Sequence, residues 1–230
     1  GSVLLTLASA FTLGALFYFV VLRPVKEAML LGQIVTTAGF ALVLSGTAVV
    51  VWRADTKAMP FPLSRFVAYD MVGMRIDQLT VGSFVVAVVT MFLLYLFVQK
   101  TKFGLAMRAV SQNDVAARVL GIPVRRVYAV TWGASATLGA IGGLLLAPVT
   151  FVSPTMMFDP FLKGFAAAVL GGLDSLPGVV IGGLVLGVVE NLFGGYVSTA
   201  FKSTVAFVII VAVLLVRPEG LLGRKFVRRV

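Results

Sequence analysis

The sequence contains no cysteine and no histidine. Without cysteine it can form neither a disulfide framework nor a thiolate metal site, and without histidine it lacks most zinc sites and most Ser/His or Cys/His catalytic groups. None of its lysines follows a glycine, so the phosphate-binding pattern G-x-x-x-x-G-K-S/T is absent as well. If nucleotide drives this protein, another chain must bind it.

Charged residues are also scarce, at 12% of the 230 residues, whereas 60% are hydrophobic and the mean hydropathy is +1.06. This composition excludes a soluble protein and indicates a polytopic membrane protein. Segments of about 20 apolar residues can cross a bilayer core about 30 Å thick. Four regular and three less regular apolar segments occur, at 3–22, 34–52, 79–98, 127–149, 161–173, 179–193 and 196–216. We therefore predict an all-α bundle of about six to seven membrane segments, forming one transmembrane domain over 1–230.

The net charge of +10 has a clear distribution. When the loops are placed alternately on two sides, most Lys and Arg residues fall on the side that holds 99–126 and the C-terminal tail. By the positive-inside rule this side is cytoplasmic, and the positive charge indicates a bilayer rather than nucleic acid as the partner. On the outer side, "FVAYDMVGMRI" predicts a short β-hairpin turning at Val72 and Gly73.

The polar stretch "RAVSQNDVAARVLGIPVRR" interrupts the apolar chain at 108–126. Ser111 and Asp114 match a capping box that begins a helix, while Gly121 and Pro123 end it, which predicts a helix over 112–120 about 13 Å long. Its apolar side chains share one stripe, formed by Val115, Ala116, Val119 and Leu120. Two interpretations remain open: a basic loop held by anionic lipid, and a docking helix for a cytoplasmic partner, which the defined helix ends favour.

The glycine-rich region 164–195 contains two apolar pieces that are each too short to cross the bilayer as regular helices. They either make two crossings or form a re-entrant pair, and short, Gly-interrupted segments of this kind are typical of a transport path. Three GxxxG spacings indicate close helix packing: Gly139 to Gly143, Gly178 to Gly182 and Gly183 to Gly187.

Glu190 is the one acidic residue that could lie within an apolar span. Because an unpaired carboxylate in hydrocarbon is costly, it either faces the bundle interior with a partner or lies at the membrane interface. Asp174 is explained by a turn in "GGLDSLPG".

Three stretches carry a family resemblance: "FGLAMRAVSQNDVAARVLGIPVRRVYAVTW", "GGLDSLPGVVIGGLVLGVVENL" and "VRPEGLLG". In this order and spacing the chain resembles the LivH-type permease subunit of bacterial ABC importers for branched-chain amino acids. The resemblance implies an inner-membrane, multi-pass permease with a cytoplasmic C-terminus. It also implies three kinds of partner: a second, LivM-like permease subunit, two cytoplasmic ATPase subunits that bind ATP and Mg²⁺, and a periplasmic substrate-binding protein.

The resemblance implies that loop 99–126 holds a coupling helix that inserts into a groove on the ATPase. The residues expected to make this coupling contact are Ser111, Asn113, Asp114, Ala116, Arg118, Val119, Leu120 and Gly121. Gly171, Gly172 and Glu190 are expected to line the substrate path or act as hinges. No catalytic residue, cofactor or metal is expected in this chain, so it is predicted not to be an enzyme.

The chain departs from the family pattern in two places. Relatives begin with further N-terminal membrane sequence that includes an Asn-x-Ala-His-Gly type segment, so the chain is expected to lack N-terminal helices. Asp174 stands where a small residue is common. Urea and amide permeases resemble the same stretches, which leaves the solute open. A self-contained channel or ion-coupled carrier and an integral membrane enzyme are the rival classes, and each needs ionisable or catalytic groups that the sequence supplies only thinly.

Overall fold

The computed structural model describes residues 1–25, 30–53, 55–59, 68–71, 74–198, 202–217 and 219–223. In chain order its elements are α1 (Ser2–Phe17), a π-helical stretch (Tyr18–Leu22), α2 (Leu30–Trp52), β1 (Ala68–Met71), β2 (Met74–Asp77), α3 (Gln78–Lys100), α4 (Lys102–Gln112), α5 (Asp114–Val119), α6 (Val124–Thr150), α7 (Phe158–Gly171), α8 (Leu176–Tyr196) and α9 (Lys202–Val216). The prediction of an all-α fold is confirmed. Helices suit an apolar chain because they satisfy the backbone hydrogen bonds within each segment.

The membrane segments follow the predicted apolar runs. Among the described residues, five helical stretches are long and apolar enough to cross a membrane: Ser2–Leu22, Gly32–Trp52, Gln78–Lys100, Val124–Thr150 and Leu176–Tyr196. The last of these stretches corrects two predicted bounds. The segment predicted over 179–193 is longer at both ends, and it includes Tyr196, which was predicted to begin the next segment. The Ser175 hydroxyl caps α8 by accepting a hydrogen bond from Gly178 N at 3.1 Å, so the helix begins earlier and reaches 21 residues.

The predicted hairpin is present as the antiparallel pair β1 and β2. Its register pairs Ala68 with Asp77 and Met71 with Met74, which leaves two residues for the turn. Val72 and Gly73, where the turn was predicted, lie outside the described residues, as do the basic residues of 224–230.

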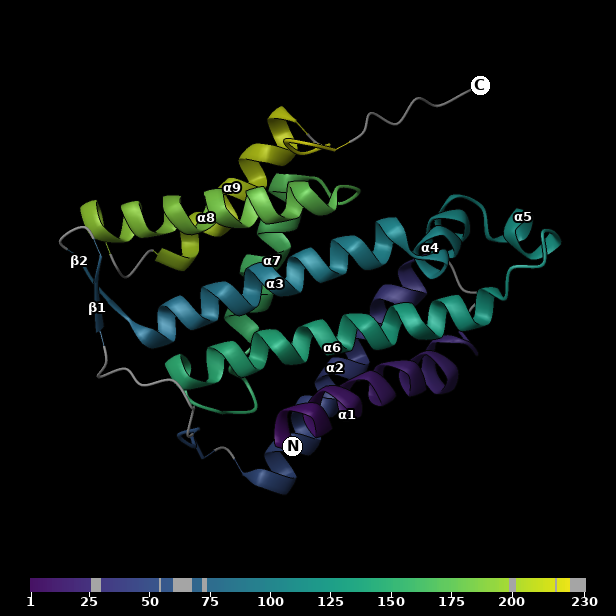
Figure 1. The fold of residues 1–230 in the computed structure, drawn as a ribbon, viewed down its shortest axis with the longest axis horizontal. Helices are drawn as coiled ribbons and strands as arrows, with labels where there is room; N and C mark the ends of the chain where they lie inside the picture. The colour runs from purple at the N-terminus through teal and green to yellow at the C-terminus, as the bar shows by residue number, and fades with distance from the viewer. Residues whose placement is uncertain are drawn as a thin grey trace. The chain divides into compact units, whose positions relative to one another are not determined.

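The chain divides into two compact units, Gly1–Pro154 and Thr155–Val230. In the first, α1 and α6 lie side by side (Figure 1), because Gly14 brings the backbones together: a Cβ there would lie 2.5 Å from Trp132 O. Next to this contact, Phe17 stacks on Phe40 of α2 with ring centroids 4.4 Å apart. The first unit therefore has a small core at one end of α1, α2 and α6.

In the second unit, α7, α8 and α9 pack around a core of small and branched side chains. Ala166, Ala167 and Leu170 of α7 and Leu186 of α8 are buried there, with Ile210 of α9 packed against them. Of the predicted GxxxG pairs, Gly178 and Gly182 lie in this interface, since a Cβ on either would overlap α7 backbone. Gly183 and Gly187 line an open hollow. A Cβ on Gly183 would lie 3.8 Å from Ala167 Cβ, an ordinary contact, and a Cβ on Gly187 would meet nothing within 4 Å.

Candidate functional site

The predicted coupling segment is a folded structure that begins with α4. Thr101 caps α4 by accepting a hydrogen bond from Gly104 N at 3.0 Å. Gly104 lies so close to the end of α3 that a Cβ would overlap the backbone oxygen of Val98. The Arg108 guanidinium donates to Gln99 Oε1 at 2.8 Å, which fixes α4 against α3 a second time. The segment therefore starts from an anchored helix.

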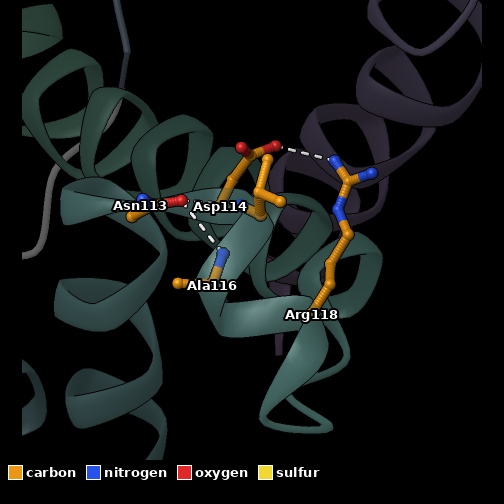
Figure 2. Close-up of polar contacts among 5 residues, drawn as sticks. Asn113, Asp114, Ala116 and Arg118 are labelled. Atoms are coloured by element: carbon orange, nitrogen blue, oxygen red, sulfur yellow. Dashed lines mark hydrogen bonds and ion pairs between the residues drawn. The ribbon is translucent and has the colours of Figure 1, made fainter.

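The start of the next helix, α5, differs from the prediction. Asn113 rather than Ser111 is the N-cap: its Oδ1 accepts hydrogen bonds from Val115 N at 3.0 Å and from Ala116 N at 2.9 Å. Figure 2 shows the bond to Ala116. Ser111 lies in the last turn of α4, where its hydroxyl donates to Arg108 O at 2.9 Å. The predicted capping box is wrong because α4 continues through Gln112, so the backbone first becomes extended at Asn113, with φ −159° and ψ 107°.

Asp114 becomes the first residue of α5 and stabilises it in two ways. A carboxylate in the first turn interacts favourably with the helix dipole. It also forms an ion pair with Arg118 one turn later, with Oδ2 and Nη2 2.7 Å apart (Figure 2). Both groups are partly exposed, so this i,i+4 pair contributes only a few tenths of a kcal/mol.

The end of α5 agrees with the prediction. Gly121 has a φ of +78°, the left-handed conformation that glycine adopts most readily. Gly121 N donates to Arg118 O and Ile122 N donates to Ala117 O, each at 3.0 Å, which is the hydrogen-bond pattern of a Schellman motif. Pro123 then caps α6, which begins at Val124. Only four residues separate the two helices.

One face of α5 is packed and the other is open. Ala117 is buried at 2% exposure against Val110 of α4 and Val124 and Val127 of α6. The predicted stripe faces outward: its four residues Val115, Ala116, Val119 and Leu120 are all exposed, with Val119 at 83%. A short apolar helix on a packed base can bind an apolar groove of a partner without first folding.

The structure places Gly171 and Gly172 at the end of α7, where both are buried. A Cβ on Gly171 would overlap the backbone of Gly178, and a Cβ on Gly172, whose φ is +103°, would lie 2.6 Å from Gly223 N. Within the second unit these glycines are therefore points of backbone contact. Their role as path or hinge residues stays a prediction.

The segment after α9 caps α7, a contact that the sequence analysis missed. Leu221 N donates to Leu170 O at 2.8 Å and Leu222 N to Gly171 O at 3.0 Å, so carbonyls at the end of α7 receive donors from outside the helix. Gly220 makes the close approach possible with a φ of +78°. In the sequence, the two glycines of "EGLLG", shortly after an apolar segment, were the signal that could have indicated this close backbone contact.

Glu190, the third predicted path residue, is buried at 7% exposure and paired. Its Oε1 lies 2.5 Å from Lys163 Nζ on α7, and Lys163 also pairs with Asp159 Oδ2 at 2.8 Å. The interior position with a partner is thus the one that the structure supports. The sequence analysis predicted neither ion pair. The i,i+4 spacing of Asp159 and Lys163 was a signal that could have indicated the second of them. Among the described residues, no group of three or more His, Cys, Asp or Glu could hold a metal ion.

Membrane-length apolar helices that pack closely through glycine, together with a short helix that exposes an apolar stripe, define a polytopic helical membrane protein. The chain belongs to the family described as branched-chain amino acid transport system / permease component, whose model matches residues 1–214. The resemblance inferred from the three sequence stretches is confirmed.

Its relatives include LivH of Salmonella typhimurium, a high-affinity branched-chain amino acid transport system permease protein. It is 34% identical over 215 residues, which cover 90% of this chain and 69% of LivH. BraD of Pseudomonas aeruginosa, described in the same words, is 32% identical over 233 residues, covering 100% of this chain and 75% of BraD. The ribose import permease protein RbsC of Bacillus subtilis is 32% identical over 144 residues, covering 58% of this chain and 44% of RbsC. No solved structure matches the chain.

Proposed function

We propose that this chain is a permease subunit of an ABC importer in a bacterial inner membrane, and that it moves branched-chain amino acids by alternating access. A second, LivM-like permease subunit completes the pathway, two ATPase subunits bind ATP and Mg²⁺, and a periplasmic binding protein delivers the solute. The 99–126 segment and the C-terminus face the cytoplasm, as the positive-inside rule predicts. The chain itself carries out no chemical reaction.

The observation that carries this proposal is the exposed stripe of α5. Val115, Val119 and Leu120 are at least 64% exposed on a helix that is capped at both ends and packed underneath through Ala117. A loop held only by charge attraction to lipid does not require such a fixed apolar face. A groove on an ATPase is a partner that such a helix fits.

Movement of α5 would pass directly into the membrane. The Ile122 N to Ala117 O hydrogen bond and the shared core of Val110, Ala117 and Val124 join α5 to α6 with little freedom. At 27 residues, α6 is about 40 Å long, enough to carry a displacement across the bilayer. Rigid-body movement of packed helices is a common mode of such transitions.

The coupling role is tested by Ala116→Asp and Val119→Asp in the assembled transporter. A carboxylate on the stripe would have to be desolvated in an apolar groove. Each variant should therefore lower solute-stimulated ATP hydrolysis at least about tenfold, equivalent to about 1.4 kcal/mol. Gln112→Asp is the matched control: it adds the same charge at an exposed position, the last residue of α4, which is not part of the stripe.

All three variants should insert into the membrane and be recovered at wild-type levels. Full stimulation in the two stripe variants, or equal loss in Gln112→Asp, would contradict the proposed role of α5.

The solute is proposed from the relatives, since LivH and BraD are both named for branched-chain amino acids. RbsC, a more partial match, is named for ribose, and urea or amide permeases are the alternative from the sequence analysis. Uptake of labelled leucine, ribose and urea by cells that lack their own importers separates these solutes. Uptake of urea alone would replace the proposed substrate and leave the permease class intact.

A second candidate, an ion-coupled carrier, is favoured by the Asp159, Lys163 and Glu190 cluster, because such carriers need ionisable groups within the membrane. Here the buried carboxylate is already neutralised by Lys163, which suits a structural pair better than an ion relay. Transport by the chain alone in ATP-free vesicles would support the carrier, whereas transport that requires ATP and the ATPase supports the importer.

A further inference from the structure

A basic cavity of about 780 Å³ lies beside α5 in the first unit. It is lined by residues from the end of the first span and from the α5–α6 connection. The residues that matter chemically are Tyr18, Arg23, Arg118, Arg125 and Arg126. Four arginines therefore line one cavity, and none of its described lining residues is acidic.

Within the part of the chain that the structure describes, three of the four arginines have no acidic partner. Arg118 pairs with Asp114 at the edge of the cavity, but Arg23, Arg125 and Arg126 form no ion pair with the carboxylates of the described residues. Arg125 and Arg126 occupy the first turn of α6, which has no acidic residue. Cations at a helix N-terminus interact unfavourably with the helix dipole. An anion in the cavity would therefore reduce both the repulsion among the arginines and their unfavourable interaction with the dipole.

Tyr18 provides a second, independent observation. It is buried at 3% exposure and lines the same cavity, yet its hydroxyl has no hydrogen-bond partner among the described residues. Arg23, Arg118 and Arg125 lie within electrostatic reach of this hydroxyl. A buried hydroxyl without a partner is destabilising, and an anionic oxygen held by the arginines would accept its proton in a hydrogen bond.

The position of the cavity decides between a lipid and a free anion. The first span ends at Leu22, directly before Arg23, and the span of α6 begins at Val124, directly before Arg125. The lining thus lies where two membrane-crossing helices leave the apolar core, which is the depth of lipid headgroups. Basic pockets between helices at this depth bind anionic headgroups.

We propose that this cavity binds the phosphate of an anionic phospholipid, with Arg23 and Arg125 contacting the phosphate and the Tyr18 hydroxyl donating to it. Arg118 joins the site from α5. The bound lipid would therefore hold the end of the first span, the start of α6 and the coupling helix together. This proposal does not depend on which solute is transported.

The test measures thermal unfolding of the full chain in neutral detergent, titrated with phosphatidylglycerol or with phosphatidylcholine. Phosphatidylglycerol should raise the unfolding midpoint, because a ligand that binds only the folded state stabilises it, and phosphatidylcholine should not. Arg23→Gln and Arg125→Gln should each weaken the apparent affinity about tenfold, since a charge-assisted hydrogen bond is lost. Arg217→Gln is the matched control, an exposed arginine at the end of α9 that does not line the cavity.

Tyr18→Phe separates binding from folding. Without lipid, this variant should be as stable as the wild type or more stable, because it removes a buried hydroxyl that has no partner. With phosphatidylglycerol, it should gain less than the wild type. If Tyr18 had only a structural role, phosphatidylglycerol would raise the unfolding midpoint of this variant and of the wild type by the same amount.

Three results would overturn the proposal. Equal stabilisation by the two lipids would show that headgroup charge is not recognised. An equal loss in Arg217→Gln would show general attraction to a basic chain. Inorganic phosphate at millimolar concentration, if it reproduced the full shift without lipid, would identify a free anion as the ligand.

Discussion

Glu190 shows how a buried carboxylate is tolerated inside an apolar helix bundle, through its ion pair with Lys163. The Glu190 side chain is 9% exposed and the Lys163 side chain 28%, and they face each other from α8 and α7. Desolvation of a carboxylate at such a site is costly, and the attraction between the partners offsets this cost only while both are present. The pair therefore favours one register of α8 against α7 without necessarily adding net stability.

Removal of one partner should consequently cost more than removal of both. Lys163→Met should lower the free energy of unfolding by on the order of 3 kcal/mol, because it leaves the Glu190 carboxylate buried beside apolar atoms. The double variant Lys163→Met with Glu190→Met should recover most of that loss. Thermal unfolding in detergent measures Lys163→Met, Glu190→Met and the double variant against the wild type.

Arg118→Met is the control for an exposed pair, since its bridge to Asp114 should contribute less than about 1 kcal/mol in lipid-free detergent. If the double variant were as unstable as Lys163→Met alone, the ion pair would contribute net stability beyond the desolvation cost of burying its charges.

At the scale of elements, α8 carries two GxxxG spacings that serve different faces. A Cβ on Gly182 would overlap the backbone oxygen of Ala167 and lie 2.8 Å from Gly171 N, whereas nothing lies within 4 Å of the Cβ position of Gly187. The first spacing therefore sets the distance between α7 and α8. The second leaves a shallow hollow beside Gly183 and Asn191 on the outer face of the helix.

The two faces predict opposite effects of the same substitution. Gly182→Ala should destabilise the chain by about 1–3 kcal/mol, because the added methyl group pushes two backbones apart. Gly187→Ala should leave stability unchanged or raise it by up to about 1 kcal/mol, since alanine favours the helix and meets no obstacle. Unfolding in detergent compares them directly, and equal losses would contradict the assignment of the two faces.

The ends of α5 illustrate what local sequence can and cannot decide. Its end was predictable because Gly121 and Pro123 act within a few residues of it. Its start was not, because Ser111 and Asn113 are both good caps and the choice depends on where α4 stops. That point depends on how α4 packs, with Val110 buried against Ala117 and the start of α6, and no local pattern encodes it.

At the scale of the whole molecule, hydropathy predicted the membrane helices well, because burial in lipid leaves long apolar runs in the sequence. Contacts between distant segments leave a weaker trace. Glu190 was recognised as unusual, but its partner Lys163 was found only in the structure, and so was the capping of Leu170 by Leu221. The basic cavity beside α5 could not be predicted from the sequence either, because Arg23 is separated from the other arginines of its lining by about a hundred residues.

The path of α7 and α8 across the membrane gives the last prediction. The sequence allowed two crossings or a re-entrant pair, and the 21 residues of α8 make a helix about 31 Å long, sufficient for a full crossing. Two crossings place Asp174 on the same side as Leu120 and Val197 on the opposite side. Since this chain has no cysteine, single substitutions to cysteine can report their side without background.

A membrane-impermeant maleimide should therefore label Val197→Cys in right-side-out vesicles, and Leu120→Cys and Asp174→Cys only in inside-out vesicles. All three positions are exposed or lie at helix ends, so labelling reports accessibility rather than unfolding. If α7 and α8 formed a re-entrant pair, both would enter and leave from the Val197 side, and Asp174 would lie at membrane depth. Asp174→Cys would then resist labelling in inside-out vesicles. That result would contradict two crossings.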